Sequence, residues 1–303
     1  MLKVRFWQDK TSLGVAFSIL AATGFSFKAI FVKQAYLVAS VEPVTLLSLR
    51  MLFSLPFFLL ISIPALKNIG KLTFRELLLL ICLGIAGYYG ASILDFMGLE
   101  YISAGLERII LFSYPALTII LGICFLGARF DKRLVLPLCM CTLGVVCACL
   151  SDLQIHTSTG SVWLGILFVA GSAFCYAFYQ AFSEPMIERI GAKAFSVLAM
   201  LVSIMAVELH FFSQLPLSAL RQPSNVYILC AMMAVFSTVL PVFFQSAAIK
   251  YIGAARSVLI SMIGPALTLI FGWLILGEVI TGLQIIGMLL VLVGVLTIKG
   301  KCN

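Results

Sequence analysis

Apolar residues gather into ten long runs, separated by short connections that hold most of the charged residues. An α-helix needs roughly 17 to 25 apolar residues to cross a bilayer, and each run has about that length. The fifth and tenth runs are the shortest, which predicts little tilt or a peripheral position. The pattern therefore predicts an all-α polytopic membrane protein with ten transmembrane helices, over residues 12–34, 44–66, 76–99, 103–127, 134–151, 162–182, 194–214, 226–248, 254–276 and 281–298.

Lysine and arginine are concentrated in alternate connections. Lys67, Lys71 and Arg75 follow the second run, and similar groups lie at the chain start, after the fourth, sixth and eighth runs, and in the C-terminal tail. The other side carries few basic residues, such as Arg221. Since positive loops stay inside, both termini are predicted to face the cytoplasm, in a plasma membrane of the bacterial inner-membrane type.

One segment of the chain occurs twice in similar form. Tyr101–Gly127 returns at Tyr251–Gly277, and the Pro-Ala-Leu-Thr run at 115–118 is repeated unbroken at 265–268. Leu13-Gly14 likewise matches Leu164-Gly165. We therefore divide the chain into two five-helix repeats, residues 1–151 and 152–303. Five is an odd number, so the second repeat must enter the membrane inverted, and inverted repeats are typical of alternating access.

These features resemble the drug/metabolite transporter superfamily, and the ten-helix EamA-type branch in particular. The likeness rests on the five-plus-five pattern, the two Pro-Ala-Leu-Thr segments and Leu276-Gly277-Glu278 after the ninth run. The first half departs from it, with Gly127-Ala128-Arg129 at the matching place. The resemblance implies a carrier with helices three, four, eight and nine around a central cavity, and helices one and six as mobile elements. It also suggests amino acids or derivatives such as S-adenosylmethionine as substrates.

Composition narrows the function further. The chain of 303 residues is 62% hydrophobic and only 11% charged, whereas about 25% is usual for soluble domains. Its net charge of +8 is spread between the runs, which argues against nucleic acid as a partner. The chain has two histidines and nine cysteines, and most of the cysteines lie inside apolar runs. Because no Cys-x-x-Cys motif is present, we predict no metal site. No phosphate-binding loop is present, so we expect no cofactor and no enzyme, with the lipid bilayer and a small solute as partners. A monomer is expected, with a dimer as the alternative.

Five ionisable residues are predicted to share one layer in the outer third of the membrane. A charge in hydrocarbon is costly, which makes each of them a functional-site hypothesis. Their counterparts in the second half are mostly neutral: Tyr179, Gln245, Ser257 and Val258. Two interpretations stay open. In the first, Lys28 pairs with Asp95, and Glu107 pairs with Arg50 or Arg108, and these ion pairs fix helix packing or an outer gate. In the second, some of the charges bind a zwitterionic or anionic metabolite, or a carboxylate carries a coupling proton. The five are Lys28, Arg50, Asp95, Glu107 and Arg108.

Polar residues at helical spacing mark faces that would line a cavity. Tyr88, Ser92 and Asp95 fall on one face of the third helix, and Tyr176, Tyr179 and Gln180 on the sixth. Such faces also serve interhelical packing, which is the alternative for each. The remaining candidates are Tyr114, Gln245 and Ser261 as cavity residues, Pro115 and Pro265 as mid-helix hinges, and Glu278, Glu184 and Glu188 as solvated helix ends.

Together these patterns predict a secondary-active transporter of a small organic metabolite. It would work by alternating access as an exchanger, a proton-coupled carrier or a facilitator. A multidrug or metabolite efflux carrier is the first alternative. A channel or an intramembrane enzyme is less favoured, because no filter-type loop and no catalytic set of residues is evident.

Overall fold

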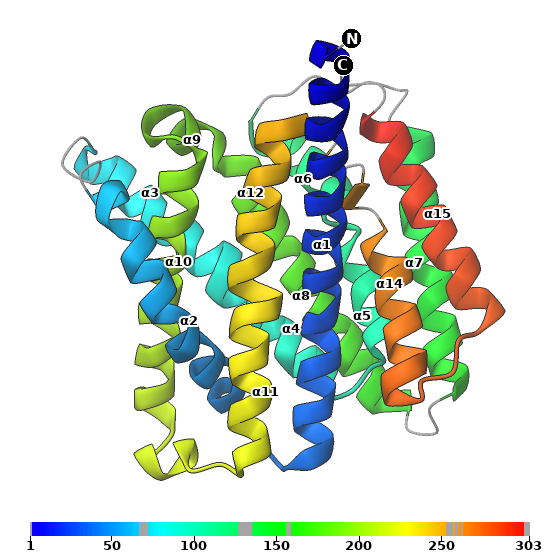
Figure 1. Ribbon diagram of the computed structural model, residues 1–303. Helices are drawn as coiled ribbons and strands as arrows, with labels where there is room; N and C mark the ends of the chain where they lie inside the picture. The colour runs from blue at the N-terminus through cyan, green and yellow to red at the C-terminus, as the bar shows by residue number, and fades with distance from the viewer. Residues whose placement is uncertain are drawn as a thin grey trace.

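The computed structural model describes residues 2–66, 72–126, 135–155, 159–252, 257, 260–261 and 263–299, and these residues form helices and connections without any strand (Figure 1). The first half holds α1 (Leu2–Val38), α2 (Pro43–Leu66), α3 (Phe74–Gly84), η2 (Ile85–Gly90), α4 (Ala91–Leu99), α5 (Ala104–Leu111), α6 (Tyr114–Phe125) and α7 (Val135–Ile155). The second holds α8 (Thr159–Phe182), α9 (Glu184–Ile190), α10 (Ala192–Gln214), η4 (Leu217–Leu220), α11 (Ser224–Ala234), η5 (Val235–Val239), α12 (Leu240–Ile252), α14 (Gly264–Phe271), η6 (Gly272–Leu276) and α15 (Gly282–Lys299).

Seven helical segments in the described part are long and apolar enough to cross a membrane. They coincide with the first four and the sixth to eighth predicted runs. Three shorter apolar helices, Leu138–Ser151, Gly264–Leu276 and Gly282–Gly294, fall on the fifth, ninth and tenth runs. Large apolar side chains such as Leu60, Met205 and Leu209 lie exposed on the outside of the bundle, where hydrocarbon would cover them. The chain is therefore a multi-pass membrane protein.

The helices lie side by side in one bundle, and α1 begins at the same end of it at which α15 finishes (Figure 1). We call this end the termini side, and the other end, which holds the connections 39–42, 100–103 and 277–281, the opposite side. α2 rises toward the termini side, whereas α10, the helix about 150 residues later, descends from it (Figure 1).

The pairs of helices that pack together are related to one another by a shift from one half of the chain to the other. α1 packs on α12, and α8 packs on α4, while α2 packs on α10 and α7 on α15. A shift of about 150 residues turns the first pair into the second and maps each of the other two onto itself.

Two glycine contacts are related by the same shift of about 150 residues. A Cβ added to Gly14 would lie 2.6 Å from Cγ2 of Ile252, and one added to Gly165 would lie 2.7 Å from Cγ2 of Ile102. These contacts lie at opposite ends of the bundle, since Gly14 is near the start of α1 and Ile102 follows α4. Only glycine permits such close helix approach, which is a common use of small residues in membranes.

Helix interruptions also recur at the same spacing. The π-helical segments η2 and η5 begin 150 residues apart, at Ile85 and Val235. The fourth span breaks after Leu111, and α6 resumes with Pro115 in its first turn, just as Pro265 lies in the first turn of α14. Both prolines were expected in the middle of a continuous helix. They begin a second helical segment instead, because a first-turn residue needs no N–H for the helix ladder.

Candidate functional site

Lys28, Asp95 and Glu107 form a buried ion network between α1, α4 and α5. Lys28 Nζ lies 2.6 Å from Asp95 Oδ2 and 3.4 Å from Glu107 Oε1. Both carboxylates are almost completely buried, and the Lys28 side chain is 19% exposed. The predicted Lys28–Asp95 pair is present. Glu107 joins the same lysine, and no ion pair connects it to Arg50 or Arg108 among the described contacts, because the long Lys28 side chain reaches both carboxylates.

Arg50 lies buried in α2, without a carboxylate in contact. It is only 6% exposed, and its guanidinium carbon lies 5.3 Å from the centre of the Phe96 ring. Its Nε and Nη1 have no hydrogen-bond partner. Asp95 is close enough to act on it electrostatically. A stacked arginine with unused donors is suited to a planar acceptor such as a carboxylate.

Arg108 is the other cation of the layer without a contacting carboxylate. Its guanidinium carbon lies 5.2 Å from the Phe112 ring centre, and its Nε is buried without a partner. A Cβ added to Gly264 would lie 3.2 Å from Arg108 Nη2. The side chain therefore reaches the start of α14, in the region where both the fourth and ninth spans are interrupted.

Four tyrosines from three spans meet in one cluster. The hydroxyls of Tyr88 and Tyr179 are 3.2 Å apart, and the Tyr114 ring meets the Tyr176 ring edge-on at 4.8 Å. Tyr176 stacks on Tyr179, and Gln180 Nε2 donates to the Tyr176 hydroxyl at 3.1 Å. The structure thus brings together five of the predicted cavity residues, which we call the tyrosine cluster.

The predicted stripe on the third span is divided between two sites. Tyr88 belongs to the tyrosine cluster, whereas Asp95 belongs to the ion network, and Ser92 lies half-buried between them in sequence. The reason is the π-helical turn of η2, which adds a residue per turn and so shifts the helical face.

Several polar residues of the ninth span contact each other, the eighth span or α1. Ser261 Oγ lies 3.4 Å from Gln245 Oε1, so these two predicted residues are neighbours. Ser18 bonds to Ser257 at 2.9 Å, and Ser26 donates to the carbonyl of Gly264 at 3.1 Å. These bonds tie α1 to the ninth span.

Three further polar contacts were not predicted. Glu278 was expected to be solvated, but its Oε1 accepts a hydrogen bond from the backbone N–H of Ala104, the first residue of α5. Ser48 donates to Glu208 at 2.7 Å, and the Tyr89 hydroxyl lies 2.9 Å from His210 Nδ1. Each joins spans far apart in sequence, so no local pattern indicates its partner. Glu188 is exposed, as expected, and the side chain of Glu184 lies outside the described residues.

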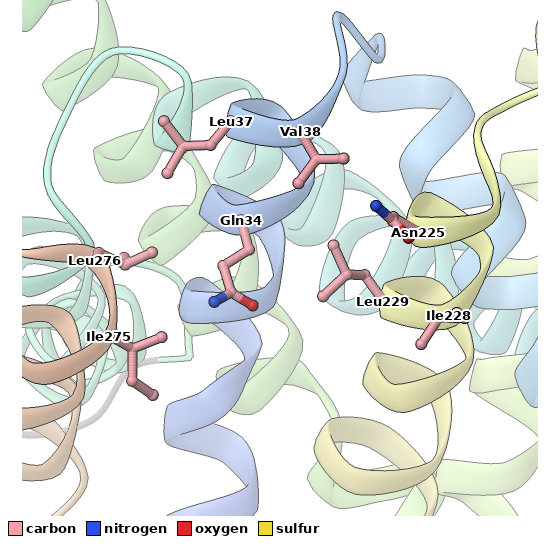
Figure 2. Close-up of a pocket in the computed structure, with 8 residues that line it drawn as sticks. All are labelled: Gln34, Leu37, Val38, Asn225, Ile228, Leu229, Ile275 and Leu276. Carbon is pink, nitrogen blue, oxygen red and sulfur yellow. The ribbon is translucent and has the colours of Figure 1, made fainter.

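An apolar crevice of about 440 Å³ lies near the opposite side, between α1, α11 and η6 (Figure 2). Gln34 and Asn225 are its polar residues, and Leu37, Leu229 and Ile275 are among its walls. Figure 2 shows Gln34 projecting between the leucines of the two flanking helices. The sequence did not indicate this crevice, since its lining is an ordinary lipid-facing pattern.

Comparison with known proteins gives one consistent result. Residues 12–150 and 163–299 each match the EamA-like transporter family. The Bacillus subtilis protein named uncharacterized transporter YcbK is 30% identical over 289 residues, which cover 92% of this chain and 90% of that protein. Another from the same organism, uncharacterized transporter YyaM, is 30% identical over 223 residues, covering 73% and 72%. A crystal structure with 14% identity shares the fold, with a TM-score of 0.58 over 95% of this chain and 96% of the other.

Proposed function

Because the chain belongs to the EamA-like transporter family, we propose that it is a secondary-active carrier of a small organic metabolite that works by alternating access between two inverted five-helix halves. That it is a transporter follows from the family. The inverted arrangement, the mechanism and the substrate class are the proposal.

The paired glycine contacts are the observation that carries this proposal. Gly14 packs against Ile252 at the termini side, and Gly165 packs against Ile102 at the opposite side. Two equivalent helix crossings at opposite ends of the bundle are what two inverted halves need in order to close one side while the other opens. The repeated π-helical segments and proline breaks support the same arrangement.

We place the termini side in the cytoplasm, because the helices that begin or end on that side adjoin most of the lysine- and arginine-rich parts of the sequence. A single cysteine at position 70 should then react from the cytoplasm, and one at position 220 from outside. Labelling of both positions from the same side would contradict the inverted arrangement.

Substrate binding or proton coupling is assigned to the ion network and its neighbours. Ionised groups are retained in a membrane interior where they have a function, and Asp95 Oδ1 and Glu107 Oε2 lack a hydrogen-bond partner among the described contacts. An ammonium group on the solute or a proton could use these oxygens. Lys28→Ala and Asp95→Asn should each abolish uptake while folded protein is still recovered, and near-normal transport by both variants would remove this assignment.

Counterflow of labelled solute in proteoliposomes tests the function itself. A carrier shows saturation and stimulation by unlabelled solute on the opposite side. A channel shows neither, and an enzyme returns a changed molecule. Candidate solutes are first selected by thermal stabilisation of the purified protein, since a ligand stabilises the state that it binds.

Efflux of apolar or amphiphilic compounds is the second candidate. The crevice of Figure 2 favours it, because its walls are mainly apolar and several of them, such as Leu37 and Ile228, are exposed at the bundle surface. Substitution of Leu229 by tryptophan should block such a carrier and leave transport of a polar metabolite almost unchanged.

A further inference from the structure

The charges of the buried layer do not balance. Lys28, Arg50 and Arg108 contribute three positive charges, and Asp95 and Glu107 contribute two negative ones. Lys28 contacts both carboxylates, Asp95 also acts electrostatically on Arg50, and Glu107 interacts electrostatically with Arg108, so that two carboxylates serve three cations. Protonation of either carboxyl group would only increase the positive excess. These five groups therefore carry one net positive charge in a region where unpaired charge is expensive.

Arg108 is the cation of the layer to which we assign this excess positive charge. It has no carboxylate in contact, its guanidinium carbon lies over the Phe112 ring, and its Nη2 lies where a Cβ on Gly264 would crowd it. Arg108 also lies in the last turn of α5, where the helix dipole favours a cation. These contacts orient the guanidinium, and its buried Nε is left without a hydrogen-bond partner.

The surroundings of Arg108 suit an anion. α14 begins beside it at Gly264, and neither α14 nor α6 has a side-chain hydrogen bond at its N-cap. Helix starts present free N–H groups and a positive dipole end, which attract anions. Tyr114 and Tyr176 are near enough to Arg108 to interact with it electrostatically and could receive the rest of a solute.

We propose that Arg108 binds a carboxylate group of the transported solute, and that this solute carries a net negative charge. The inference rests on the proposed function and makes it more specific: the substrate is an organic acid, or an amino acid with a second acidic group, in place of a neutral zwitterion. The anion completes the charge balance of the layer as it binds between the two interrupted spans.

The first test needs no knowledge of the solute. Acetate and acetamide differ mainly in charge, so acetate should raise the thermal midpoint of the purified wild-type protein more than acetamide does at equal concentration and ionic strength. The difference should vanish in Arg108→Gln and persist in Arg221→Gln, a control at an exposed arginine of a connection. An equal acetate effect in wild type and Arg108→Gln, or no acetate effect at all, overturns the proposal.

The stability of the empty variants gives an independent readout. If Arg108 serves a ligand, Arg108→Gln without ligand should be at least as stable as wild type, because an unpaired charge is removed. If Arg108 only supports packing over Phe112, the same variant should unfold at a lower temperature, and the proposal fails. Arg108→Lys should keep part of the acetate effect, because lysine keeps the positive charge but loses the planar guanidinium that binds a carboxylate through two N–H groups.

Transport separates this inference from the function on which it rests. Counterflow is measured with organic acids and their amides, such as glutamate with glutamine and succinate with succinamide. A rise of at least tenfold in the half-saturation concentration of the acids in Arg108→Gln supports the inference. Exchange of neutral or cationic solutes alone overturns it and leaves the carrier intact. Absence of trans-stimulation for every solute that stabilises the protein contradicts the proposed function itself.

Discussion

Lys28 is the residue on which the buried carboxylates depend. Its ammonium group lies between Asp95 and Glu107, so its removal leaves two acids facing each other in a dry region. Breaking a buried ion pair from one side costs about 3 to 5 kcal/mol. Lys28→Met should lose stability of that order, and Asp95→Asn should lose less, because the Lys28–Glu107 contact remains.

The pH dependence of unfolding checks this ranking. In Lys28→Met the uncompensated carboxylates gain a proton as the pH falls, which removes the unfavourable charge. The deficit of Lys28→Met relative to wild type should therefore shrink between neutral and acidic pH in thermal unfolding in detergent. A deficit that is constant over this range would show that Lys28 contributes through packing alone.

The hydroxyl contact between Tyr88 and Tyr179 is a second single-residue case. A hydrogen bond of this kind contributes about 0.5 to 1.5 kcal/mol, and removal of either hydroxyl breaks it, while Ser196 stays available to the hydroxyl that remains. Tyr88→Phe and Tyr179→Phe should therefore be non-additive, with the double variant close to either single one. The thermal midpoints of the three variants measure this coupling, and strict additivity would mean that the two hydroxyls act separately.

At the scale of elements, Glu278 links the connection after η6 to the start of α5. A Cβ on Gly272 would lie 2.8 Å from Glu278 Oε2, so Gly272→Ala should push the carboxylate away from the Ala104 N–H. Helix caps are worth about 1 kcal/mol. Glu278→Ala and Gly272→Ala should each lower stability by about that amount, and their combination should add little. Unfolding that is additive in the double variant would separate the glycine from the cap.

The elements also mark how far the sequence could predict this protein. Long apolar runs located the spans, because hydrophobic length is a strong signal in membranes. The residues of the charge layer and of the tyrosine cluster could be selected, since polar groups in apolar runs are conspicuous. The contact between Lys28 and Glu107 could not be predicted, because it depends on how far side chains reach across three spans. The π-helical turn of η2, which separates Tyr88 from Asp95, leaves no trace in apolar periodicity.

At the scale of the whole molecule, the two glycine crossings should control the two sides of the bundle separately. A methyl group at Gly14 would press on Ile252 and part α1 from α12 at the termini side. A methyl group at Gly165 would press on Ile102 and part α8 from α4 at the opposite side. If the halves rock about a site between them, Gly14→Ala should favour opening toward the cytoplasm and Gly165→Ala opening toward the outside.

A single cysteine at Ser92, in a background without other cysteines, reports on this equilibrium because Ser92 is half-buried in the third span and lies in sequence between Tyr88 of the tyrosine cluster and Asp95 of the ion network. Its rate of reaction with a membrane-impermeant thiol reagent is measured in whole cells and in inside-out vesicles. Gly14→Ala should accelerate the reaction in vesicles and slow it in cells, and Gly165→Ala should do the reverse. Gly282→Ala, where an added Cβ meets no atom within 4 Å, should change neither rate. Because steric separation at one end closes the other only when the halves move as opposed bodies, a change of the same sign from both variants would mean that the bundle loosens without rocking.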